Sequence, residues 1–242
     1  MISMDALFEM KSALEWTGLL VLWAVFLQSI EMILLPSPMI FRFLNGSRAL
    51  FSAWVWIGLL SGRETHPLEY LILALMTWTA LIPYGGLFNG GSDAMLMMIL
   101  LALAASGLKG GGVLALMWVG IISLLSYFIS GLRKSIHADW WNGRALESFL
   151  LGSRISLYNC AQLLARQPWI RWVSPAVVLF QVFFPVAVLG GFASKGLLAL
   201  GFGFHLSNFA LFGLNRFFWV WMATYPCLVW VSQHGFIWVS GV

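Results

Sequence analysis

Long runs of apolar residues, separated by short polar stretches, extend along the whole chain. A helix needs about 20 apolar residues to cross a bilayer, and fewer where neighbouring protein shields it. The runs therefore predict about eight membrane-spanning helices. The strands of a membrane β-barrel would alternate apolar and polar residues instead, so the expected fold is an all-α, polytopic helical bundle. The predicted spans lie near residues 14–35, 49–61, 68–84, 93–108, 113–132, 170–190, 195–212 and 216–232.

The polar connections between these runs are too short for a soluble domain, so a single membrane domain over residues 1–242 is expected. Apolar residues at helical spacing in residues 1–13 predict a short N-terminal helix that lies in the membrane interface. The longest polar connection, residues 133–169, contains apolar stretches such as 146–151. This connection is therefore expected to form interfacial helices as well.

Composition supports a membrane protein. Hydrophobic residues make up 61% of the chain and charged residues only 9%, whereas a soluble domain is about half apolar and about a quarter charged. No run of Lys and Arg could follow a phosphate backbone, so the expected partners are the lipid bilayer and other membrane proteins in a complex, not nucleic acid. Cys160 and Cys227 have no CxxC spacing, which favours unpaired thiols and no metal site.

Four ionisable residues directly follow the predicted span 113–132, and they are Arg133, Lys134, His137 and Asp139. Charge beside a membrane helix is unfavourable and often marks a functional site. Two simpler interpretations stay open. Lys and Arg often end a span by reaching the headgroups, and Lys134 can form a weak interfacial ion pair with Asp139.

Lys134 is the strongest candidate for a catalytic group. At the boundary of a low-dielectric region the charged form of a lysine is disfavoured, and a neutral amine can act as a general base. Arg133 beside it would disfavour the second positive charge further. His137 and Asp139 are placed to orient the amine or to relay a proton.

Two further polar groups lie in or beside apolar runs. His205 and Asn208 are three residues apart, so they share one face of a helix, where they either bond a neighbouring helix or line a site. Asn89 and Asp93 flank the start of the predicted span 93–108. There they either cap the helix or form the wall of a polar pocket.

Two segments together resemble the membrane domain of vitamin K-dependent γ-carboxylases and their bacterial relatives, the horizontally transferred transmembrane domain family. The first segment reads YFISGLRKSIHADWWNGRAL, and the second reads FHLSNFALFGLNRFF. Asn89-Gly90-Gly91 with Asp93 also resembles the Asn-rich turn of that family. The matching residues of the two segments are Tyr127, Phe128, Gly131, Lys134, Asp139, Trp140, Gly143, Ala145 and Leu146, then His205, Asn208, Leu211, Phe212 and Phe217.

The resemblance implies that Lys134 matches the lysine that deprotonates vitamin K hydroquinone. The oxygenated quinone then abstracts a proton from a glutamate γ-carbon, and the carbanion captures carbon dioxide. His205 matches a histidine of the family's site helix. The resemblance to bacterial members also implies a location in the bacterial inner membrane.

This chain departs from the family pattern in three places. One residue is inserted between Lys134 and Asp139. Gly91 and Ser92 stand where the carboxylases have a histidine. Gln181 stands where many bacterial members have a glutamate, and an amide neither takes nor gives a proton in ordinary catalysis.

Two functions are therefore expected. The first is a quinone-binding membrane enzyme that uses Lys134 as a base on a peptide or small substrate, with His205 as a second catalytic residue. The second is a non-catalytic membrane subunit of a larger complex, for example a pigment-binding, electron-transfer or maturation complex, which the two missing ionisable groups favour. In the first case the residues expected to bind the quinone are Asn208, Asn89, Arg133, His137, Asp139 and Gln181.

Overall fold

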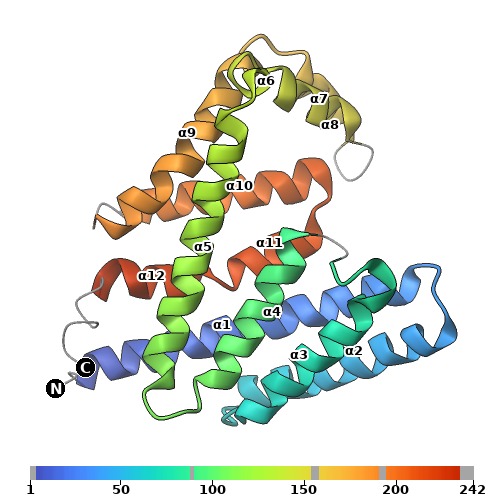
Figure 1. Cartoon of the computed structure of the whole chain (residues 1–242), viewed down its shortest axis with the longest axis vertical. Helices are drawn as coiled ribbons and strands as arrows, with labels where there is room; N and C mark the ends of the chain where they lie inside the picture. The colour runs from blue at the N-terminus through green and yellow to red at the C-terminus, as the bar shows by residue number, and fades with distance from the viewer. Residues whose placement is uncertain (1–3, 88–89, 154–157, 191–194, 235–242) are drawn as a thin grey trace. The chain divides into compact units, whose positions relative to one another are not determined.

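The computed structural model of the chain describes residues 4–87, 90–153, 158–190 and 195–234, and in these ranges it contains helices and turns but no strand (Figure 1). The predicted all-helical fold is therefore confirmed. The chain divides into two compact units. Unit 1 contains residues 1–121 and 219–242, and unit 2 contains residues 122–218.

Unit 1 is built on a long helix, α1, against which α2 packs along its length (Figure 1). The helix α3 contacts both α2 and α4, while α4 and α12 also contact α1. The first half of α5 and the second half of α11 belong to this unit as well. The elements are α1 (Met4–Leu34), α2 (Met39–Leu60), α3 (Pro67–Leu81), the 3₁₀ turn η1 (Ile82–Tyr84), α4 (Gly91–Ala105), α5 (Gly111–Ser135), α11 (Asn215–Met222) and α12 (Tyr225–His234).

Local sequence signals explain where the helices of unit 1 begin and end. Pro36 and Pro38 follow the end of α1, and proline cannot continue a helix because it lacks the backbone donor. Before α3, the ring of His66 accepts a hydrogen bond from the backbone of Leu68 at 3.3 Å. In return, the backbone N–H of His66 donates to the Glu69 carboxylate at 2.9 Å. This reciprocal capping satisfies donors that the first turn would otherwise leave open.

The interior of unit 1 contains polar groups between apolar helices. Gln28 of α1 donates through Nε2 to Oδ1 of Asp93 at 2.7 Å, and both side chains are buried. The fully buried Arg48 of α2 donates through Nε to Oγ of Ser29 at 2.8 Å. Buried charges need such partners because their desolvation is expensive. Asp93 therefore joins α4 to α1, in addition to its place in the first turn of α4.

In its described residues, unit 2 consists of the second half of α5, the helices α6 to α10 and the start of α11. Short helices connect the end of α5 to the long helix α9, and α6 contacts both α7 and α9 (Figure 1). Gly143 has a φ of +87° immediately before α7, and a Cβ at this position would lie 2.5 Å from the α-carbon of Arg171. Glycine thus permits both the turn and the packing. The helices are α6 (Ala138–Trp141), α7 (Arg144–Gly152), α8 (Tyr158–Ala165), α9 (Ile170–Leu189) and α10 (Lys195–Phe212).

Among the described residues, four helices are long and apolar enough to cross a membrane, and two more are apolar but shorter. The protein is thus a membrane protein by helix length and composition, whereas the predicted number of about eight spans is not confirmed. The predicted span 49–61 is part of α2, which carries Arg42 and Arg48. The predicted span 216–232 is divided into α11 and α12 around Thr224. The long helices are Phe8–Leu34, Pro67–Tyr84, Gly111–Ser135 and Ile170–Leu189, and the shorter ones are Gly91–Ala105 and Gly196–Phe212.

The two segments predicted as interfacial differ in structure. Residues 4–34 form one uninterrupted helix, so residues 1–13 do not provide a separate N-terminal helix over their described part. Polar residues change which face of a helix is solvated but do not by themselves end it. The segment 133–169 contains the end of α5 and the three short helices α6, α7 and α8. Their location at the membrane surface stays a prediction.

Candidate functional site

The site is built on one face of α5. Tyr127, Ser130 and Lys134 are spaced by three and four residues, so their side chains lie above one another along the helix. This face packs against α9, which lies beside α5 within unit 2 (Figure 1). Lys134 belongs to the last turn of α5, where its positive charge suits the negative end of the helix dipole.

A close approach of α5 and α9 depends on Gly131. A Cβ at this position would lie 2.8 Å from both the backbone nitrogen and Cγ2 of Val182, and 3.0 Å from the carbonyl carbon of Gln181. No larger residue fits without a shift of backbone, since these distances are below normal van der Waals contact. Gly131 thereby determines how near the side chain of Gln181 comes to that of Lys134.

The amine of Lys134 is surrounded by neutral groups. Its Nζ donates to Oγ of Ser130 at 2.6 Å and to Oε1 of Gln181 at 2.8 Å. The Ser130 hydroxyl also lies 3.4 Å from the same Gln181 oxygen, and the carbonyl of Ser130 lies 3.4 Å from Nζ. In addition, Nζ lies 5.2 Å from the centroid of the Trp140 ring, a cation–π distance. Lys134 is half-buried, and Gln181 is buried.

The ion pair between Lys134 and Asp139 does not form. In the described part of the chain, no carboxylate lies within 4 Å of the Lys134 amine. The exposed carboxylate of Asp139 instead accepts a long hydrogen bond, 3.5 Å, from Nδ2 of Asn142. A buried or half-buried ammonium normally has a carboxylate partner, so its absence distinguishes Lys134 from a structural ion pair.

His205 of α10 lies beside Tyr127, and Tyr127 is two turns before Lys134 on α5. Nε2 of His205 and the hydroxyl of Tyr127 are 2.5 Å apart, and both side chains are buried. Aromatic rings surround this pair, with ring centroids between 4.4 and 6.0 Å from Tyr127 or His205. The rings are those of Phe180, Phe184, Phe204 and Phe217.

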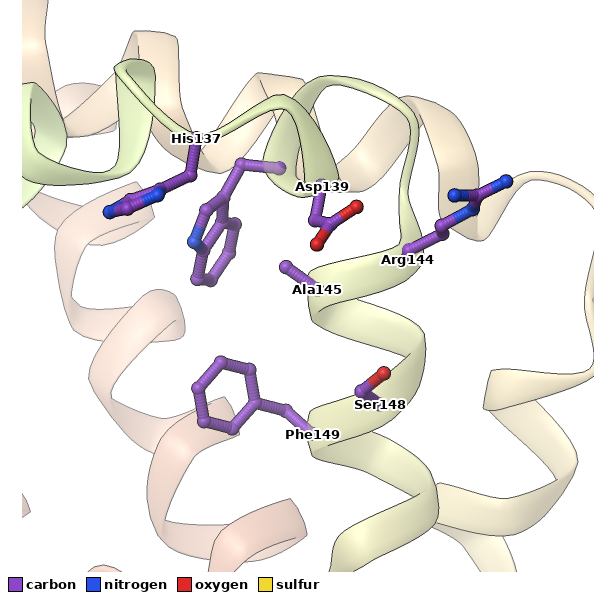
Figure 2. Close-up of a pocket in the computed structure, with 7 residues that line it drawn as sticks. His137, Asp139, Arg144, Ala145, Ser148 and Phe149 are labelled. Carbon is purple, nitrogen blue, oxygen red and sulfur yellow. The ribbon is translucent and has the colours of Figure 1, made fainter.

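A pocket of about 420 Å³ lies beside Lys134, between α6 and α7. Figure 2 shows Asp139, Ala145 and Phe149 facing a common space, while the Arg144 side chain points outward from α7. Trp140 and Phe149 supply aromatic rings 5.8 Å apart to the wall. The lining residues are His137, Asp139, Trp140, Arg144, Ala145, Ser148 and Phe149.

The predicted site residues differ in where they lie relative to the Lys134 amine and the pocket. Lys134 and Gln181 are in direct contact, and His137 and Asp139 line the adjacent pocket. Arg133 is exposed at the end of α5, and Asn208 is half-buried on α10. Asn89 lies outside the described residues. Convergence of Lys134, His205 and Asn208 on one cavity therefore stays a prediction. Lys134 lies on the face of α5 whose Tyr127 contacts His205.

The sequence assigned no chemical role to three residues of the site, Ser130, Tyr127 and Trp140, although Tyr127 and Trp140 are among the residues that match the family motif. Ser130 and Tyr127 share the face of Lys134, and their spacing was a usable signal. The contact of Trp140 with Lys134 depends on the turn between α5 and α6, which periodicity does not predict. In the described ranges, no group of three His, Cys, Asp or Glu residues is placed to hold a metal ion.

Comparison with known proteins gives one match. The family model of the HTTM domain matches residues 113–232, which include most of α5, all of α6 to α11 and most of α12. No curated protein and no solved structure matches the chain. The matched range contains Lys134, Gln181, His205 and the pocket between α6 and α7.

Proposed function

Residues 113–232 form an HTTM domain, the horizontally transferred transmembrane domain found in vitamin K-dependent γ-carboxylase, and on that premise we propose that the protein is a quinone-binding membrane enzyme in which Lys134 acts as a base. A bound hydroquinone supplies the acidic hydroxyl from which Lys134 removes a proton. His205 is the second catalytic residue in this proposal. The substrate is a peptide or a small molecule.

The observation that carries the proposal is the neutral environment of the Lys134 amine. Ser130 and Gln181 orient Nζ through hydrogen bonds of 2.6 and 2.8 Å. Neither group is an anion, so neither holds the proton on the amine as a carboxylate would. An amine that is oriented but not neutralised by a counter-ion is suited to take a proton from a bound substrate.

The aromatic surroundings of His205 fit a quinone. Planar aromatic rings stack favourably on aromatic side chains, and Tyr127 with its phenylalanine neighbours presents such rings within unit 2. An isoprenoid quinone is carried in the lipid phase, and α5 and α9 are both candidate spans. A quinone that reached this cluster would lie along the face of α5 that also carries Lys134.

One observation favours the second function, a non-catalytic membrane subunit. The Lys134 amine already has acceptors in Ser130 and Gln181, and these contacts join α5 to α9. An amine with these bonds can serve helix packing alone. In that case the HTTM scaffold would bind partner helices or pigments in a larger complex.

The test begins with purification in mild detergent and mass spectrometry of the co-purified lipids. The enzyme proposal expects a quinone in the wild type and its loss in a His205→Phe variant. It also expects Lys134→Met to retain the quinone and to lose turnover of the native quinol pool. A stable larger assembly on a native gel, free of quinone and unchanged by Lys134→Met, would establish the subunit function instead.

A further inference from the structure

Trp140 belongs to two environments at once. Its ring lies 5.2 Å from the Lys134 amine, and the same residue lines the pocket between α6 and α7. Lys134 itself is not among the lining residues of that pocket. Trp140 is therefore a lining residue of the pocket that also contacts the Lys134 amine.

The backbone of Trp140 is held by hydrogen bonds, whereas its half-buried ring makes none in the described part of the chain. The carbonyl of Trp140 accepts a hydrogen bond from the buried Ser174 hydroxyl at 2.7 Å, and its N–H donates to the carbonyl of His137 at 3.1 Å. In the described part of the chain, the ring contacts Lys134 and Phe149, and its Nε1 makes no hydrogen bond. A rotation about the side-chain torsions thus breaks no hydrogen bond, and such rotations are fast for partly exposed side chains.

The chemistry of the pocket differs from that of the aromatic cluster around His205. Its polar lining residues His137, Asp139, Arg144 and Ser148 are all exposed. Polar groups beside an aromatic wall select a polar ligand and not a hydrocarbon chain. The two sides of Lys134 therefore suit two different reactants, one lipid-borne and one water-borne.

We propose that the pocket between α6 and α7 is the binding and entry site for a polar, water-borne substrate, which reaches Lys134 when the indole of Trp140 rotates aside. The lipid-borne quinone approaches from the aromatic cluster, so the two reactants do not compete for one route. This inference rests on the proposed role of Lys134, but its test measures access to position 134 and needs no activity.

The experiment measures how fast a cysteine at position 134 reacts with a charged, membrane-impermeant methanethiosulfonate. In Lys134→Cys with Trp140 intact, labelling of position 134 is slow. Adding Trp140→Ala accelerates it at least about tenfold, because position 134 is then always accessible and not only in the minority of molecules whose indole has rotated aside. Adding Ala145→Trp as well fills the pocket and slows the labelling again, since Ala145 lines the pocket and faces its space (Figure 2).

The chain supplies matched controls. Trp141 is the neighbouring tryptophan and its Nε1 donates to the carbonyl of Ser135, so Trp141→Ala leaves the labelling rate unchanged. Leu151→Trp places the same side chain on α7 outside the pocket and has no effect. The exposed Cys160 of α8 reports folding, because its own labelling rate is the same in every folded variant. If Trp140→Ala does not yield monodisperse protein, Trp140→Val replaces it with the same expectation.

Two results would overturn the inference. Equal labelling rates with and without Trp140 would show that the indole does not limit access. An accelerated rate that Ala145→Trp leaves unchanged would show that the route does not pass through the pocket. Either result can be obtained while the lipid analysis still finds a quinone, so failure of the entry site and failure of the proposed function are distinguishable.

Discussion

The amine of Lys134 donates to the side-chain oxygen of Gln181 at 2.8 Å, although the two residues are 47 positions apart in the sequence. A glutamine here gives the amine an acceptor without a counter-charge. The neutral amide of Gln181 thus leaves the proton on the Lys134 amine without an anionic partner.

Replacing Gln181 by glutamate should make Lys134 less reactive. A carboxylate 2.8 Å from the amine would form an ion pair and keep it protonated, and only the neutral amine attacks an acylating reagent. Mass spectrometry after brief treatment with acetic anhydride should therefore show several-fold less acetylation at Lys134. Gln167→Glu, on an exposed site of the same unit, is the control. Unchanged acetylation in Gln181→Glu would mean that the contact does not govern the amine.

Replacing Gly131 by alanine should destabilise unit 2. The added methyl group would meet Val182 at 2.8 Å, and overpacking of this kind costs about 1–3 kcal/mol. Thermal unfolding in detergent, followed by circular dichroism, should show a lower midpoint. Gly203→Ala on α10 is the matched control, because nothing lies within 4 Å of its added Cβ. That substitution should be neutral or slightly stabilising, since alanine favours helix; equal midpoints for the two variants would argue against the close contact.

Tyr127→Phe should weaken the attachment of α10 to α5. The variant keeps the ring but removes the hydroxyl that bonds Nε2 of His205, and an unmet buried polar group costs about 1–3 kcal/mol. The thermal midpoint should fall, and a double-mutant cycle with His205→Phe should be non-additive. Ser126→Ala removes a local hydroxyl bond within α5 and should change the midpoint less. Additive effects in the cycle would contradict the pairing.

Gln28→Leu should destabilise unit 1 through Asp93. The substitution removes the donor at 2.7 Å from a buried carboxylate, and hydrogen bonds to charged groups contribute about 1.5–3 kcal/mol. Gln28→Glu should be worse, because it places two carboxyl groups together. The exposed Gln233 provides a control in the same unit, and Gln233→Leu should leave the thermal midpoint unchanged. A Gln28→Leu protein as stable as the wild type would show that Asp93 does not depend on this bond.

The helical fold could be predicted because apolar runs leave few alternatives in a membrane, but the number of spans could not. Run length does not reveal that the chain turns near Thr224 and divides one apolar run into two helices. Nor does the presence of charge indicate where a helix ends. Residues 4–34 form one helix although Lys11 and Glu15 lie inside it, since both residues are good helix formers.

The candidate site was predictable where it depends on charge and not where it depends on packing. Lys134 was identified because four ionisable residues gather in an apolar chain. The pairing of Tyr127 with His205 joins residues 78 positions apart, and a spacing within one helix cannot indicate the partner on another. Gln181 was noted for the glutamate that it replaces, while its contact with Lys134 emerged only from the packing of α9 on α5.

The missing side chain of Gly131 has a consequence for how this protein can change over generations. Every substitution there moves α9 away from α5 before it alters any reacting group. Variation that tunes the amine is therefore confined to positions such as Ser130 and Gln181, where a side chain can be exchanged while the backbone spacing is kept. A saturation library at these three positions should consequently yield many folded variants at 130 and 181, but at 131 mainly glycine, with alanine recovered only as a less stable protein.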